Sequence, residues 1–175
     1  MGLFSFLKNK PQIVEKQEPK SNVTDNNERF RILSKSSMEY LRTGEIDFYR
    51  NDLFDMARIL EKEGKLTDAL KQYLYVFYLD TTGISSLEAL RLGYKPKPMI
   101  APGILNRIRI VRNKLKLTDA ELKDLYFTCP TESIFPDAVF TYQESYELLE
   151  ECFKENGTPD AMMQKAIKRY NKSHK

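Results

Sequence analysis

Apolar residues recur at helical spacing between residues 51 and 82, and this stretch has the most regular pattern in the chain. Four apolar side chains of its first part fall on one helical face: Leu53, Met56, Ala57 and Leu60. A broader apolar face follows, formed by Ala69, Leu70, Tyr73, Leu74, Val76 and Phe77. Gly64 separates the two, as expected where a helix ends. We therefore predict two antiparallel helices, with Asn51 or Asp52 capping the first and Thr67 capping the second.

This hairpin resembles a tetratricopeptide (TPR) repeat, a helix–turn–helix unit of ~34 residues. Ala57 and Ala69 match the small residues at which the two helices of that family cross, and Gly64 matches its turn. Val76 and Thr81 depart from the family, which has Ala and Pro at those positions, and Leu53 replaces a Trp. The resemblance covers residues 51–82 alone.

The resemblance implies a groove along the first helix of the hairpin. Its lining residues in this chain would be Asn51, Phe54, Arg58, Glu61 and Lys62. Phe54 is the expected anchor for a partner, because aromatic side chains dominate the energetics of protein interfaces. These five residues are the predicted partner-binding set.

Helical patterns also flank the hairpin. The predicted helices cover residues 28–43 (with a break near Ser36), 85–93, 102–117, 118–129, 136–157 and 158–172, and the first hairpin helix is expected to extend backwards over residues 45–50. Gly44 and Gly83 are expected to end the helices before them, and Thr118 with Glu121 has the spacing of a capping box. The aromatic run 72–80 would also suit a strand, but the turn at Gly64 favours a helix. The fold class is therefore all-α, an antiparallel helical array or short TPR-like solenoid, in one domain over residues 29–175.

Residues 1–28 form a predicted flexible tail. Residues 2–7 are mostly apolar, and a polar segment containing Pro11 and Pro19 follows them. The apolar stretch is too short for a signal peptide. Three interpretations remain open: residues 2–7 dock on the domain, contact a membrane surface weakly, or bind a partner.

The predicted helix 104–117 carries five basic residues and no acidic one. They are Arg107, Arg109, Arg112, Lys114 and Lys116. On a helical wheel Arg107 and Lys114 fall on one flank, and the other three fall on the opposite flank. Such a basic patch suits an acidic protein surface, an acidic segment of this same chain, or the phosphates of a nucleic acid.

Composition argues against several kinds of chemistry. The 28 basic and 25 acidic residues leave a net charge of +3, too balanced to indicate nucleic-acid binding by itself. Two cysteines make no disulfide framework, and the one histidine, His174, excludes histidine-based catalytic triads. No phosphate-cradling glycine loop or Cys/His metal spacing occurs. We therefore expect no enzyme activity, no cofactor and no metal.

These observations predict a cytoplasmic, non-catalytic module that binds another protein, as an adaptor, regulator or inhibitor. The partner would contact the hairpin groove or the irregular, proline-containing loop 94–103. Two alternatives are a nucleic-acid-associated protein that uses helix 104–117 and a peripheral membrane factor that uses residues 2–7.

Overall fold

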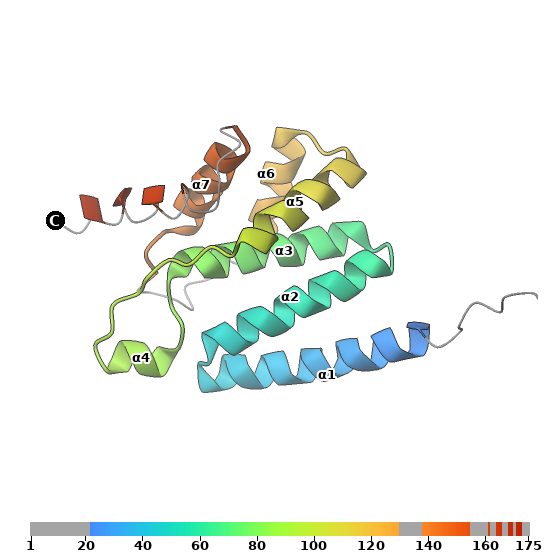
Figure 1. Ribbon diagram of the computed structural model, residues 1–175, viewed down its shortest axis with the longest axis horizontal. Helices are drawn as coiled ribbons and strands as arrows, with labels where there is room; N and C mark the ends of the chain where they lie inside the picture. The colour runs from blue at the N-terminus through green and yellow to red at the C-terminus, as the bar shows by residue number, and fades with distance from the viewer. Residues whose placement is uncertain are drawn as a thin grey trace, which may run out of the picture.

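A computed structural model describes residues 22–129 and 138–154, and residues 161, 164–165, 168–169 and 171–172 near the C-terminus. In these residues every regular element is a helix, which confirms the all-α class (Figure 1). The helices are α1 Asn22–Thr43, α2 Ile46–Lys62, α3 Leu66–Thr82, α4 Leu87–Arg91, α5 Pro102–Leu115, α6 Asp119–Phe127 and α7 Tyr142–Lys154. Residues 2–7, and with them the three interpretations of the apolar stretch, lie outside the described residues.

Helix α3 is the centre of the fold. It packs against α2 on one side and against α5, α6 and α7 on the other, and α1 covers the outer face of α2 (Figure 1). Every residue from Tyr73 to Thr82 is buried, because α3 has neighbours on nearly all sides. Burying one large apolar side chain contributes about 1.5–3 kcal/mol, so this helix supplies much of the stability of the core.

The hairpin of α2 and α3 forms as predicted, with Gly64 at its turn in the left-handed region at φ +76°. Ala57 and Ala69 are completely buried where the helices cross. The backward extension of α2 is confirmed, because the helix begins at Ile46, which precedes Asn51 in the chain. Burial of Ile46 in the core stabilises this first turn. The predicted caps at Asn51, Asp52 and Thr67 are therefore wrong, since all three lie inside helices.

Helix α1 is continuous through Ser36, where a break was predicted. The Ser36 hydroxyl donates to the carbonyl of Leu33 in the preceding turn and to Asp52 of α2, so it joins two helices and caps neither. The helix begins at Asn22, so the last residues assigned to the tail are helical. Gly44 ends the helical region at φ +81°, as expected.

An extended segment, residues 94–101, leads from α4 back across the end of α3 to α5. The amide of Lys97 donates to the Gly83 carbonyl at 2.7 Å, and the amide of Met99 donates to the Asp80 carbonyl at 3.0 Å. Gly83 has φ +72°, and a Cβ atom there would lie 2.6 Å from the backbone of Lys97. Glycine is thus required by both backbone conformation and close approach. We call residues 94–101 the strap.

Helices α6 and α7 both begin with a Thr and a Glu three residues later that exchange hydrogen bonds. The Thr118–Glu121 capping box of α6 is present as predicted. Helix α7 begins at Tyr142, later than predicted, where Thr141 and Glu144 exchange hydrogen bonds of the same kind. Residues 138–141 are not helical, and Pro136, the predicted start, lies outside the described residues.

Candidate functional site

Two hollows open along α2, one at each end. The first has a volume of about 500 Å³ and lies between the start of α2, the end of α3 and the strap. Its lining is mainly apolar, with a few polar and charged residues: Ile46, Leu79, Ile84, Met99 and Ile100, with Arg50, Asn51 and Asp80. The second, of about 230 Å³, lies between α2 and α5 and is lined by Arg58, Glu61, Lys62, Arg107 and Lys114. We call them the apolar hollow and the basic hollow, and the α2 surface that joins them the α2 groove.

The groove lies between two helices that run in the same direction on α3 (Figure 1). At one end Arg50 of α2 pairs with Asp80, which also binds the amide of Ala101 beside the start of α5. At the other end Glu61 of α2 pairs with Arg107 and Lys114, further along α5. Charged contacts therefore link α2 to the α5 side at both ends of the groove.

A buried ion pair forms one wall of the apolar hollow. Arg50 donates from Nε to Asp80 Oδ1 at 2.5 Å and from Nη2 to Oδ2 at 3.0 Å, and Ala101 N donates to Oδ2 at 2.9 Å. The Asp80 side chain is only 4% exposed. Burial raises the pKa of Asp80 above its ordinary value, although Arg50 and the Ala101 amide oppose that shift. The pair thus ties α2, α3 and the start of α5 together.

The rim of the apolar hollow is more accessible. Met99, on the strap, is 68% exposed, and the charged residues Asp47 and Lys97 also line the hollow. Burial also raises the pKa of Asp47, against the opposing charge of Arg50. An apolar interior with charged residues at its edge is the usual arrangement of a surface that accepts an apolar side chain.

Glu61 organises the basic hollow. Its Oε1 accepts from Lys114 Nζ at 3.0 Å, and its Oε2 accepts from the Tyr73 hydroxyl at 3.0 Å and lies 3.5 Å from Arg107 Nη1. Burial by itself would raise the pKa of Glu61, but the hydrogen bonds from Lys114 and Tyr73 and the charge of Arg107 outweigh it and lower the pKa. Glu61 is therefore held ionised between two cations of α5.

The basic hollow carries more positive charge than Glu61 can balance. Its four basic side chains face one carboxylate, which leaves a surplus of three positive charges. Arg58 is half exposed and reaches only Asp55, at 3.7 Å, and Lys62 is exposed. This surplus favours binding of an anionic group from solution.

The five residues predicted on α2 all lie along this groove. Asn51 lines the apolar hollow, and Arg58, Glu61 and Lys62 line the basic hollow. Phe54 lies between them in sequence and is only partly exposed: its ring centre is 5.7 Å from that of Tyr73 and 5.8 Å from the Arg50 guanidinium. Phe54 thus also packs against the core, which its spacing alone did not reveal.

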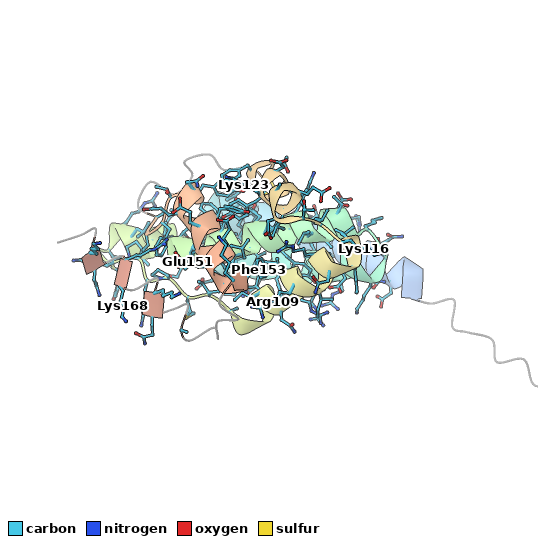
Figure 2. All side chains as sticks on the ribbon, turned by 90° about the horizontal axis from the view of Figure 1, so that it is seen from above. Arg109, Lys116, Lys123, Glu151, Phe153 and Lys168 are labelled. Carbon is cyan, nitrogen blue, oxygen red and sulfur yellow. The ribbon has the colours of Figure 1, made fainter. Side chains whose placement is uncertain are left out.

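The five residues of the predicted basic patch are divided by the fold. Arg107 and Lys114 face α2, whereas Arg109 and Arg112 face α7, where both guanidinium groups lie within 5.6 Å of the Phe153 ring centre (Figure 2). Arg109 also donates to the Cys152 carbonyl, and Arg112 to the Leu117 carbonyl and to Asp119. Lys116 ends α5 in a left-handed conformation, away from Phe153 (Figure 2).

Arg50, Tyr73 and Asp80 are site residues that the sequence analysis did not identify as such. Asp80 is the one charged residue after Lys71 in the otherwise largely apolar α3. A lone carboxylate at the end of a buried helix needs a charged or polar partner. That requirement was the available signal, although it could not name Arg50.

Comparison with models of known protein families, with curated proteins and with solved structures found no match for this chain. In the described ranges no three His, Cys, Asp or Glu side chains are grouped so that they could hold a metal ion. No described helix has both the length and the apolar character needed to cross a membrane. The class defined by fold and site is an all-α helical array with a charged groove along α2.

Proposed function

We propose that this chain is a non-catalytic protein-interaction module, an adaptor, regulator or inhibitor, that holds a segment of a partner protein in the α2 groove. The observation that carries the proposal is the row formed by Asn51, Phe54, Arg58, Glu61 and Lys62, which leads from one hollow to the other. The resemblance of residues 51–82 to a TPR repeat implies the same face of the hairpin.

The apolar hollow supplies the anchor for the partner. Its floor of buried isoleucine and leucine side chains would release water on contact with an apolar side chain, and the exposed Met99 adapts its shape to what it meets. The Arg50–Asp80 pair stays within the wall, because both oxygens of Asp80 are already engaged. We therefore expect the partner to place a bulky apolar residue in this hollow.

The basic hollow supplies selectivity. A positive surplus beside an apolar anchor selects a segment that carries negative charge, and it speeds the encounter at low salt. The division of the basic patch favours a protein over a nucleic acid, since a phosphate backbone requires cations in a continuous row. Cys129 and Cys152 are buried free thiols, which supports action in the cytoplasm.

The proposal is tested by capturing partners from native cells with the tagged full-length chain, with and without nuclease. The informative variant is Asn51→Arg, which places a long side chain at the exposed edge of the apolar hollow, and Lys35→Glu on exposed α1 is the control. We expect one protein to be retained by the wild type and by the control, to resist nuclease, and to be lost from Asn51→Arg. If the wild type, the control and Asn51→Arg all retain that protein, the α2 groove is excluded as its binding surface.

A further inference from the structure

The basic hollow contains more hydrogen-bond donors than the fold uses. Lys114 has three N–H groups and contributes one hydrogen bond to Glu61, and Arg107 has five and approaches Glu61 only at 3.5 Å. Arg58 reaches Asp55 at 3.7 Å, which is too long for a hydrogen bond. Donors on both walls thus remain available to a ligand.

Glu61 has the same sign of charge as an anionic ligand, yet its position favours binding of an anion. Lys114 covers one of its oxygens and Tyr73 covers the other, so neither oxygen points unpaired into the hollow. Its charge also draws Arg107 and Lys114 of α5 towards Arg58 and Lys62 of α2. Glu61 therefore positions two cations before any ligand arrives, which lowers the ordering cost of binding.

We propose that the basic hollow binds a phosphorylated side chain of the partner segment, an inference that rests on the proposed function. A phosphoryl group carries a charge close to −2 at pH 7 and has three acceptor oxygens. It can therefore bridge cations on both helices and balance most of the surplus of three charges. A carboxylate has one charge and two oxygens, and a single arginine can bind both oxygens.

The arrangement of charges argues for a single phosphoryl group over a nucleic-acid backbone. The next cations along α5, Arg109 and Arg112, are turned towards Phe153 and carbonyl groups on the other flank. The hollow instead is lined by four cations, Arg58 and Lys62 of α2 and Arg107 and Lys114 of α5, and the two of α5 are held by Glu61. One dianionic group meets all of them, whereas successive phosphates along a strand do not.

Nuclear magnetic resonance titration of the ¹⁵N-labelled full-length chain tests the assignment. The probes are N-acetyl-phosphoserine amide, its aspartate counterpart, inorganic phosphate and a short oligothymidylate. We expect saturable shifts around Arg58, Lys62, Arg107 and Lys114 with the phosphoserine probe, at least about tenfold stronger than with aspartate, and weaker at high salt. The double variant Arg58→Gln/Lys62→Gln should weaken this binding at least about tenfold.

The matched control is Lys35→Gln/Lys123→Gln, which removes two exposed lysines outside the groove and the strap and should leave phosphoserine binding unchanged. Equal binding of aspartate, tighter binding of inorganic phosphate, or an equal loss in the control would overturn the assignment. So would an oligothymidylate whose shifts extend over Arg109, Arg112 and Lys116. Groove-dependent capture without phosphoserine binding refutes this inference alone, and phosphoserine binding without groove-dependent capture refutes the proposed function alone.

Discussion

The two ends of the α2 groove use charge in different ways. At the apolar hollow, Arg50 and Asp80 are buried, balanced and connected by two hydrogen bonds, and the pair holds three elements together. At the basic hollow, Glu61 faces four cations, two of which belong to the accessible face of α2. Arg50 and Asp80 balance each other at the first end, whereas Glu61 balances only part of the positive charge at the second. Charged side chains that no opposite charge of the fold neutralises are the better indication of a binding site.

Removing Asp80 should cause the largest loss of stability. Asp80→Leu leaves the largely buried Arg50 without its carboxylate and the Ala101 amide without an acceptor. Breaking a buried pair from one side costs about 3–5 kcal/mol in the free energy of unfolding, measurable by urea denaturation. Arg50→Met/Asp80→Leu should recover much of this loss, because no uncompensated charge remains. A single-variant cost below about 1 kcal/mol would show that the pair is not structural.

Alanine in place of either turn glycine should lower the stability of the fold, and the loss should be larger at Gly83 than at Gly64. Gly64 and Gly83 both have positive φ, so alanine at either position is strained. At Gly64 an added Cβ meets open space, and the expected cost is about 1 kcal/mol. At Gly83 it collides with the strap backbone at 2.6 Å, and we expect at least about 2 kcal/mol. Equal midpoints for the two variants in thermal unfolding would contradict the close packing of the strap.

The contribution of Glu61 to the free energy of unfolding should depend on pH. Because its pKa is lowered in the folded state, Glu61 stabilises the fold above its unfolded pKa, ordinarily about 4.3, and this contribution is lost as the pH falls through the folded pKa. Glu61→Gln should thus be less stable than the wild type near pH 7, and the difference should shrink towards pH 3. Asp80 acts in the opposite sense, since its pKa is raised. Parallel curves of unfolding free energy against pH would contradict this account.

The smallest effect is expected from the surplus charges. Arg58→Gln/Lys62→Gln removes two exposed cations, and the Arg58–Asp55 ion pair that it breaks is long, at 3.7 Å. The free energy of unfolding should change by no more than about 0.5 kcal/mol, because such surface charges contribute little. Chemical denaturation gives the value directly. A loss above about 1.5 kcal/mol would mean that the fold depends on them after all.

The sequence predicted the helices best where periodicity and turn residues agreed. The α2–α3 hairpin, the glycine ends at Gly44 and Gly83, and the capping box at Thr118 are confirmed. Among the wrong boundaries, the predicted break at Ser36 and the predicted cap at Asp52 involve polar side chains that bond to another helix. Ser36 bonds to Asp52, a residue distant in sequence, and no local pattern contains that information.

The sequence predicted one of the two walls of the candidate site, the wall formed by α2. Helical spacing placed Asn51, Arg58 and Lys62 on one accessible face of α2, since a helix fixes its own geometry. It also separated Arg107 and Lys114 from the remaining basic residues of α5. That these two sets meet around Glu61 depends on both helices packing against α3, which is a tertiary contact. Whether the groove binds a partner stays a prediction.

The most direct test measures partner capture and folding on the same samples. Quantitative mass spectrometry of captured proteins compares the wild type, Arg58→Glu/Lys62→Glu and the control Lys35→Glu/Lys123→Glu, after circular dichroism confirms equal helical content. The account predicts a protein that is captured by the wild type and the control and is depleted from the groove variant at least about tenfold. Equal capture by all three folded proteins would contradict the assignment of the α2 groove as the binding surface.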